Sequence, residues 1–326
     1  MPEFNGSTTQ GEVLQAFSSQ VKGRTFVITG AGQPSIGSQL AVALAKAGPA
    51  QIVIASRSLS KVEPVIRAIQ SINGTIRTSF VQMDLSNHAS VRQAAVKILQ
   101  AAPTIDVLIN SAGNMAIKDY MLDKQGIEIQ FSANHIGHFL LTNLLVPGLK
   151  AAAKSNGGAR VVNLTSGAYL VSPVLFDDYN FSNGATYQRW TAYGQAKTAN
   201  ILFAFALTKR LQSHGITSTA AHPGYNGDTE LAKHLTWDDF AEIEPIAKQN
   251  TGKDFVWEEP RLKNFEQIAA TPLIAALDPD LPAKSPAYLQ NSVVTQSDES
   301  ASSEVNADKL WKLSEKLVNQ EFEYKA

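Results

Sequence analysis

Short apolar segments rich in β-branched residues recur along the chain from Arg24 onward, and stretches rich in Ala, Leu, Gln and Lys separate them. Each segment is nearly all apolar rather than alternating, which is typical of strands buried on both faces. Alternation of such strands with helices predicts an α/β fold, a doubly wound parallel sheet with helices on both sides. The predicted strands are Thr25–Thr29, Gln51–Ala55, Thr78–Gln82, Ile105–Ile109, Arg160–Leu164 and Thr217–Ala221.

The whole chain, residues 1–326, is expected to form a single Rossmann-like domain, since no internal repeat divides it. Residues 225–263 interrupt the alternation, are charged, and are too short for a separate domain. We expect this insertion to cover a cleft at the carboxyl edge of the sheet. Its four large aromatics either line an apolar substrate pocket, which we favour, or only pack together; they are Trp237, Phe240, Phe255 and Trp257.

Residues 278–326 are expected to form a C-terminal extension. Its first part, 278–301, is rich in Pro, Ser and Asp and is expected to wrap the surface, with one short strand near Tyr288-Leu289-Gln290. A tail helix, Ala307–Asn319, and an opening helix, Glu12–Gln20, each show one apolar face and are expected to dock on the body. The docking residues are expected to be Val13, Leu14, Phe17, Leu310, Leu313, Leu317 and Val318.

The amino-acid composition argues against several classes of function. Among 326 residues, Lys and Arg number 28 against 29 for Asp and Glu, so no net field attracts nucleic acid or an anionic membrane. The absence of cysteine excludes disulfides, thiolate metal sites and thiol nucleophiles. The start of the chain is polar, and we find no apolar run long enough to span a bilayer. We therefore expect a cytoplasmic protein with no nucleic-acid or membrane partner.

The segment Tyr193-Gly194-Gln195-Ala196-Lys197 places a phenol and an ammonium one helical turn apart, at the start of an apolar helix. A phenol titrates near ~10, and bringing it near ~7 requires about 4 kcal/mol of preference for phenolate. A cation at ~4 Å supplies about 1 kcal/mol in water but about 4 at a protein-like dielectric. The pair can therefore act on a proton only where water is mostly excluded.

The first predicted strand runs into a glycine-rich turn, Thr29–Gly37 (TGAGQPSIG), and then into a helix. Backbone amides at such a helix start bind phosphate, and glycine lets the backbone come close. The strict G-x-G-x-x-G pattern fails because its third glycine would fall at Ser35. An ordinary strand-to-helix turn stays open, but the place on the first strand favours a dinucleotide site.

Twenty residues beyond Gly37, the second predicted strand ends in Ser56-Arg57-Ser58. An acidic residue at this point favours NAD, whereas a basic residue accommodates the 2′-phosphate of NADP. We therefore expect NADP (NADPH) in preference to NAD, with an exposed loop arginine as the alternative.

Several motifs occur in a fixed order over roughly Lys22 to Val318. They are the glycine turn, Asn110-Ser111-Ala112-Gly113, Asn134–Asn143 (NHIGHFLLTN), Val161–Ser166 (VVNLTS), Tyr193 with Lys197, His222-Pro223-Gly224 and Leu310–Leu317 (LWKLSEKL). With these motifs the chain resembles the short-chain dehydrogenase/reductase family. The match is closest to its retinol-dehydrogenase-like subgroup, which includes the WW-domain-containing oxidoreductase.

The resemblance implies a catalytic tetrad of Asn134, Ser166, Tyr193 and Lys197. Tyr193 would give or take the proton, and Lys197 would lower its pKa and hold the nicotinamide ribose. Ser166 would hold the substrate oxygen, while Asn134 would order a water that connects Lys197 to solvent. Besides Tyr193 and Lys197, the residues expected to contact the cofactor are Gly30, Gly32, Ser35, Ile36, Gly37, Arg57, Asp84, Leu85, Asn110, Ala112, Gly113, Pro223, Gly224 and Thr229.

The expected function is an NADP(H)-dependent oxidoreductase that interconverts a carbonyl and an alcohol on a lipophilic or aromatic small molecule. The alternative is a catalytically silent NADP-binding regulatory or scaffold protein. A nucleotide-sugar epimerase fits poorly, because the segment after Lys197 resembles the ending of the retinol-dehydrogenase-like subgroup and leaves little room for a sugar-nucleotide lobe. The resemblance also implies a homodimer interface on the helices containing Asn134 and Tyr193, which the C-terminal extension would block or enlarge.

Two further sites are weighed and set aside. His135 and His138 lie at helical spacing, but no third ligand with suitable spacing is evident. We expect packing and hydrogen-bonding roles for them, and no metal. Ser166 lacks the G-x-S-x-G elbow of a serine hydrolase.

Overall fold

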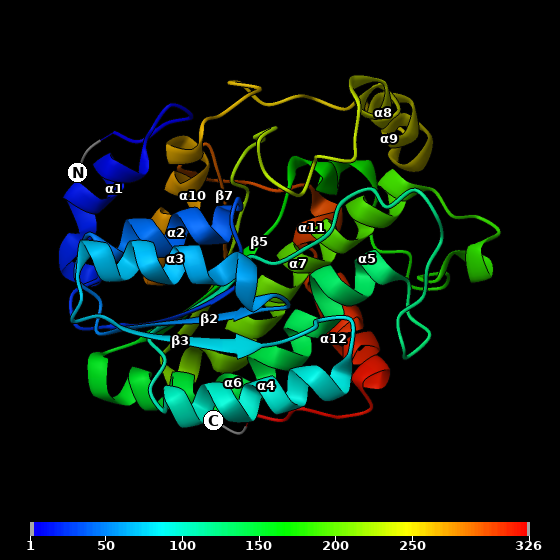
Figure 1. Cartoon of the computed structure of the whole chain (residues 1–326). Coiled ribbons are helices and arrows are strands. Elements are labelled where there is room, and N and C mark those ends of the chain that lie inside the picture. Colours follow the sequence, from blue (N-terminus) through cyan, green and yellow to red (C-terminus); the bar gives the residue numbers. More distant parts are fainter. Residues whose placement is uncertain (1–2, 325–326) are drawn as a thin grey trace.

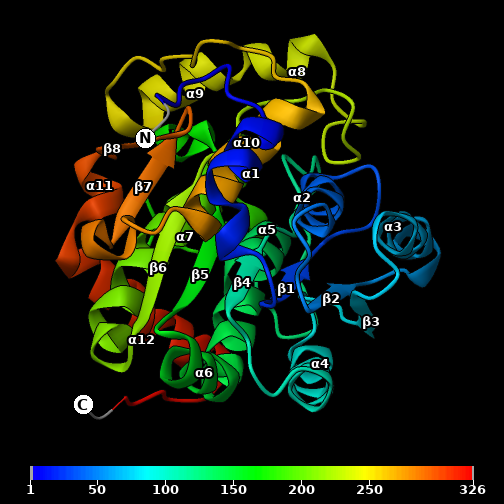
Figure 2. The same cartoon turned by 90° about the vertical axis from the view of Figure 1, so that its left-hand side faces the viewer.

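The computed structural model describes residues 3–324, and a sheet of eight strands lies at its centre. The strand order is β3-β2-β1-β4-β5-β6-β7-β8, and neighbouring strands are parallel except for the antiparallel pair β7 and β8. Figure 2 shows this order across the molecule. The strands are β1 Thr25–Thr29, β2 Gln51–Ser56, β3 Arg77–Gln82, β4 Val107–Asn110, β5 Ala159–Leu164, β6 Ile216–Ala221, β7 Ala287–Gln290 and β8 Val293–Thr295.

Helices cover both faces of the sheet, as Figure 1 shows with the sheet seen on edge. One face carries α1 Gln10–Phe17, α2 Ile36–Ala45, α3 Leu59–Ile72 and α10 Phe265–Leu277. The other carries α4 His88–Ala101, α6 Gly137–Asn156, α7 Arg189–Leu211 and α12 Glu304–Val318. The shorter helices are α5 Ile129–Phe131, α8 Trp237–Ala241, α9 Ile243–Thr251 and α11 Glu299–Ser302.

The six strands predicted from the sequence are confirmed, and so is the doubly wound α/β fold. β1 is buried at all five positions, which explains why its sequence is apolar without alternation. The largest shift is in β4, which begins at Val107 rather than Ile105. The amide of Ile105 instead donates a hydrogen bond to Gly148 O at 3.0 Å, outside the sheet.

The expected surface wrap over 278–301 is wrong in part. β7 pairs in parallel with β6 and buries Tyr288 and Leu289, so this segment extends the sheet. β8 then returns antiparallel at the edge, with all three of its residues exposed. The strand expected near Tyr288 is present, but the hairpin that it forms with Val293–Thr295 was not predicted.

Both terminal helices dock as predicted. Val13, Leu14 and Phe17 of α1 are buried in the cluster that includes α10. Leu310 and Trp311 of α12 are buried against residues of α6 and α7.

One helix corrects the expectation that no apolar run reaches the length of a membrane span. Residues Ile129–Asn156 form a continuous helix of 28 residues, and an 18-residue window within it has the mean hydropathy, 1.2, that meets this criterion. In the molecule, 72% of this apolar window is buried against the sheet and its neighbours. The polar residues Asn134, His135 and His138 within it concealed the run.

Candidate active site

A cavity of about 650 Å³ opens at the carboxyl edge of the sheet. Strand order reverses between β1 and β4, and ligands of doubly wound sheets bind in the crevice at such a point. Turns after β1, β2, β3, β4 and β5 contribute to its wall, together with α7 and the segment after β6. In Figure 1 the helices α8 and α9 of the insertion lie beyond the end of the sheet toward which β3 points.

Fifteen of the residues predicted for the site line this cavity. They are Gly30, Gly32, Ser35, Ile36, Arg57, Asp84, Leu85, Ala112, Gly113, Ser166, Tyr193, Lys197, Pro223, Gly224 and Thr229. Gly37, Asn110 and Asn134 lie behind the wall instead. Asn110 is buried and donates to Asn163 Oδ1 at 2.9 Å and to Thr142 Oγ1 at 3.0 Å, so its side chain joins β4 to β5 and α6.

Tyr193 and Lys197 lie one turn apart on α7 and are almost fully buried, with 3% and 5% of their surface exposed. Lys197 Nζ donates to Leu164 O at 3.3 Å and lies 5.4 Å from the centroid of the Tyr193 ring. Burial raises the pKa of Tyr193 to about 12, although a hydrogen bond with Ser166 lowers it in part. Burial also lowers the pKa of Lys197 to about 8. The expected lowering of the Tyr193 pKa by Lys197 is therefore not seen in this arrangement.

Ser166 is the second residue after the end of β5 and lies opposite α7. Its hydroxyl accepts from Ala168 N at 3.2 Å, which caps the short turn Gly167–Val171. Thr165 donates to Lys197 O at 2.8 Å, and Asn200 donates to Leu164 O at 2.9 Å. These contacts fix the end of β5 against α7, so the hydroxyl of Ser166 is held close to the Tyr193 phenol.

Asn134 occupies a π-helical turn, Ser132–Ile136, where a local widening of the helix often marks a functional site. Its side chain is buried and exchanges two hydrogen bonds with the backbone of Asn114, at 2.8 and 3.0 Å. A Cβ at Gly113 would lie 2.6 Å from Asn134 Oδ1, so a larger residue there would displace the Asn134 side chain. The backbone carbonyl of Asn134 accepts from His138 Nδ1 at 3.0 Å.

The glycine turn is built around Ser35, the residue that breaks the strict pattern. Ser35 is the N-cap of α2: its hydroxyl accepts from Ser38 N and donates to Gly30 O, each at 3.0 Å. Gly30 has a φ of +71°, and a Cβ there would lie 2.5 Å from Ala112 Cα. The first amides of α2 are thus presented at the cavity wall, as an anionic diphosphate requires.

The far end of the cavity is cationic. Arg57 is exposed and lines the wall beside Ser58 and Lys61. Lys61 was missed from the sequence, although it lies one helical turn beyond Arg57. Its Nζ pairs at 3.0 Å with Glu230 of the insertion, which also lines the cavity.

The apolar part of the cavity differs from the expectation. None of the four aromatics Trp237, Phe240, Phe255 and Trp257 lines it; they pack among themselves and on Trp190 of α7. The apolar lining comes mainly from Met115, Ile117, Ile129, Tyr225 and Leu231. Met115 and Ile117 directly follow Asn110–Gly113, and this proximity was the signal available in the sequence.

The two histidines set aside as a metal pair make hydrogen bonds within the core. His138 Nε2 contacts Thr29 Oγ1 at 2.8 Å, and His135 Nε2 contacts Ser314 Oγ at 2.9 Å. Burial lowers the pKa of His135 to about 3 and that of His138 to about 4, so both rings are neutral. Within residues 3–324, no group of three or more His, Asp or Glu side chains could hold a metal ion.

The model of the short chain dehydrogenase family matches residues 24–239. Short-chain dehydrogenase TIC 32 A, chloroplastic, of Brassica napus is 36% identical over 321 residues, which cover 97% of this chain and 94% of that protein. Retinol dehydrogenase 13 of Homo sapiens is 39% identical over 214 residues, or 66% of this chain and 62% of that protein. A crystal structure from Mycobacterium paratuberculosis superposes with a TM-score of 0.69 at 31% identity, covering 94% of this chain and 98% of that one. The chain therefore belongs to the short-chain dehydrogenase family, whose oxidoreductases use nicotinamide cofactors, and retinol dehydrogenases are among its relatives.

Proposed function

We propose that the protein is an NADP(H)-dependent oxidoreductase that interconverts a carbonyl and an alcohol on a lipophilic or aromatic small molecule. One observation carries the proposal: Tyr193 and Lys197 share a cavity wall with the helix-capping glycine turn and with Arg57. A proton donor, a phosphate-binding helix start and a cationic far end thus face one space of about 650 Å³.

A bound nicotinamide cofactor would supply or accept the hydride. This chain then needs to orient the substrate oxygen and to move one proton. Tyr193 lines the cavity and is protonated at neutral pH, but burial raises its pKa to about 12, so donation of its proton to a carbonyl oxygen requires Lys197 to lower that pKa when the cavity is filled. Ser166 lines the same cavity as Tyr193, so its hydroxyl is placed to hold that oxygen beside the donor.

Preference for NADP is supported by the charge at the end of β2. Arg57 lines the wall at the position where an acidic residue would favour NAD, and Lys61 lines it nearby in an ion pair with Glu230. A lipophilic substrate is supported by the apolar lining from Met115, Ile117 and Leu231.

The test is a pair of measurements on the purified chain. Affinities for NADPH and NADH, titrated at equal salt and pH, are expected to favour NADPH by ~10-fold or more, because a charge-assisted 2′-phosphate contact is worth ~1.5–3 kcal/mol. Reduction of a panel of lipophilic aldehydes and ketones is expected to consume NADPH in wild type but not in Tyr193→Phe, which should still bind the cofactor.

Each contrary outcome has its own meaning. Tighter NADH binding would overturn the NADP assignment and leave the chemistry standing. Turnover unchanged in Tyr193→Phe would refute the role of the phenol. Cofactor binding without any Tyr193-dependent turnover would favour the silent binding protein.

A further inference from the structure

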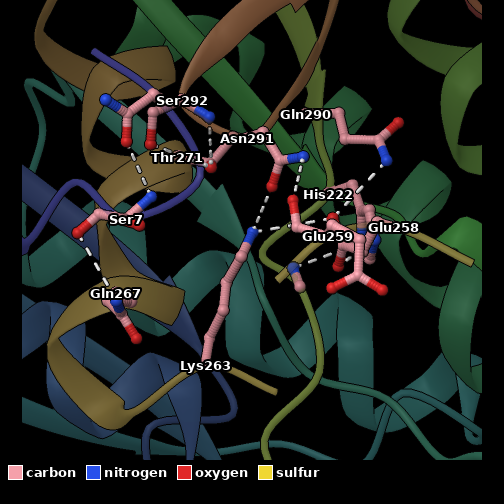
Figure 3. Close-up of polar contacts among 12 residues, drawn as sticks. Ser7, His222, Glu258, Glu259, Lys263, Gln267, Thr271, Gln290, Asn291 and Ser292 are labelled. Atoms are coloured by element: carbon pink, nitrogen blue, oxygen red, sulfur yellow. Dashed lines mark hydrogen bonds and ion pairs between the residues drawn. The ribbon is translucent and has the colours of Figure 1, made fainter. Parts of the chain in front are cut away.

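Three ionisable side chains from distant parts of the sequence meet beside the cavity. His222 follows β6, while Glu258 and Lys263 lie at the end of the insertion (Figure 3). His222 Nε2 is 2.9 Å from Glu258 Oε1, and Lys263 Nζ is 3.5 Å from Glu258 Oε2. Their side chains are 7%, 9% and 1% exposed, so solvent screens these contacts very little.

The β7–β8 hairpin completes this cluster. Lys263 Nζ donates to Asn291 Oδ1 at 2.7 Å, and Gln290 Nε2 donates to Glu258 Oε2 at 3.4 Å. The cluster therefore joins three segments that are otherwise independent: the turn after β6, the end of the insertion and the last hairpin of the sheet (Figure 3).

The carboxylate of Glu258 lies between two partners. Gly224 N donates to His222 Nδ1 at 3.4 Å, so Nε2 is the ring nitrogen that faces Glu258 Oε1. On its other side the carboxylate faces the ammonium of Lys263. Burial raises the pKa of Glu258, but His222 and Lys263 outweigh burial and hold it below its ordinary value. Removal of either charged partner would leave an unpaired buried charge, which is far more costly than removal of both.

Lys263 also supports the turn of residues 222–226 through its backbone and its stem. Its amide donates to Tyr225 O at 2.9 Å, and its carbonyl accepts from Asn226 Nδ2 at 2.8 Å. A Cβ at Gly224, where φ is +91°, would lie 2.5 Å from Lys263 Cδ. All five residues of this turn line the cavity that contains Tyr193 and Lys197. The shape of one cavity wall thus depends on a lysine that does not itself line it.

We propose that Glu258 and Lys263 are positioning residues: their buried ion pair sets the shape of the 222–226 turn and, through it, the affinity of the cavity for the nicotinamide cofactor. The predicted effect on cofactor affinity rests on the proposed function. The predicted effect of the ion pair on the 222–226 turn does not depend on that function. Neither side chain lines the cavity, so both act through the turn and not by contact.

The experiment compares wild type with Glu258→Gln, Lys263→Met and the double variant. It measures NADPH affinity, amide hydrogen exchange at Gly224, Tyr225 and Asn226, and thermal unfolding. Each single variant is expected to bind NADPH at least ~10-fold more weakly and to exchange faster at the turn, because one buried charge loses its partner. The double variant, which carries neither charge, is expected to recover to within ~3-fold of wild type.

A matched control is Asp106→Asn, which removes a different buried charge. Asp106 is 2% exposed and accepts from Thr25 N at 2.8 Å and Asn156 Nδ2 at 2.6 Å, at the start of β4 and away from the cavity. It is expected to unfold at a lower temperature with NADPH affinity and turn exchange unchanged.

Three outcomes would overturn the proposal. Single variants that lose thermal stability but keep NADPH affinity within ~3-fold would show a purely structural cluster. A double variant as impaired as the worse single would refute the ion-pair account. If wild type binds neither NADPH nor NADH, the proposed function fails. Hydrogen exchange at Gly224, Tyr225 and Asn226 then tests the positioning role by itself, and unchanged exchange in Lys263→Met would overturn it.

Discussion

At the scale of single residues, burial of Tyr193 and Lys197 favours the neutral form of each side chain. Burial raises the pKa of the Tyr193 phenol to about 12, so the phenol keeps its proton but is a weaker acid than an exposed tyrosine. The same burial lowers the pKa of Lys197 from 10.5 to about 8, so the folded state holds this ammonium less readily than the unfolded chain does. The site is therefore assembled at a cost to the fold, as is common where a buried charge serves function.

Replacement of Lys197 by Met is accordingly expected to stabilise the protein while it abolishes turnover. At pH 7 the lysine is charged in both states, and the lowering of its pKa from 10.5 to about 8 corresponds to about 3 kcal/mol of unfolding free energy. Between about pH 8 and 10.5 the unfolded state binds more protons, so wild-type stability rises with pH and the advantage of the variant shrinks. Denaturant unfolding at pH 7 and pH 9.5 checks this, with the gain at pH 9.5 falling to roughly half.

Lys209→Met is the comparison for this prediction. Lys209 lies on the same helix but is 53% exposed and pairs with Glu304 and Asp308 at the surface. It is expected to change stability by less than ~1 kcal/mol. A Lys197→Met variant no more stable than wild type at pH 7 would show that the ammonium is well compensated in the folded state.

At the scale of secondary-structure elements, the central strands could be predicted because they are buried on both faces and need no partner to be recognised. β8 could not, since its three residues are exposed and it exists only by pairing with β7. The helix Ile129–Asn156 was concealed because Asn134 and His138 sit in its apolar run, where they bond to Asn114 and Thr29. In the sequence these polar residues seem to interrupt the apolar run, whereas in the folded chain they form a hydrogen-bonded network.

The candidate site divides in the same way. Tyr193 and Lys197 share one helix and the glycine turn is continuous, so local spacing was enough to identify them. The cluster of His222, Glu258 and Lys263 depends on segments that approach only in the folded chain, and Glu258 and Lys263 look like ordinary surface charges in the sequence. The prediction that the insertion aromatics line the pocket was wrong for a related reason: apolar composition does not indicate which neighbours a side chain packs against.

Glu128 shows how one element positions a site residue, because it begins the helix that carries Asn134. Its carboxylate is fully buried and accepts from Gln130 N at 2.9 Å and Phe131 N at 2.8 Å. Burial raises its pKa from 4.5 to about 7, although both hydrogen bonds oppose this. In the folded state the carboxyl thus holds its proton to higher pH than in the unfolded chain, and wild-type stability is lost as pH rises from about 4.5 through 7.

Glu128→Gln does not titrate and is expected to escape this loss. Relative to wild type, its unfolding free energy should improve by about 2–3 kcal/mol between pH 5 and pH 8. Any cost of the weaker cap is the same at both pH values and cancels in that comparison. Chemical denaturation at the two pH values measures it, and a difference independent of pH would mean that the two amide contacts hold the carboxyl at an ordinary pKa.

At the scale of the whole molecule, the C-terminal extension covers the surface of α6 and α7 that the family resemblance implied for a homodimer. Trp311 of α12 packs edge-on to Phe139 of α6, with ring centroids 5.0 Å apart, and lies 6.2 Å from Phe203 of α7. Arg92 donates to Val318 O at 3.1 Å, so the end of α12 is also tied to α4. One chain therefore buries by itself an apolar surface of the kind that would otherwise need a partner.

We therefore predict that the full chain does not associate through α6 and α7. Size-exclusion chromatography with light scattering is expected to give 35.1 kDa at micromolar concentration. Trp311→Ala opens the packing over Phe139 and Phe203 and should cost about 3–5 kcal/mol of unfolding free energy, with self-association rising as the apolar surface is exposed. Val305→Ala, at a position on α12 that is 64% exposed, is the control and should change neither mass nor stability. A full-chain dimer whose hydrogen exchange is protected along α6 and α7 would contradict this, because α12 would then have to leave its place for the partner to bind.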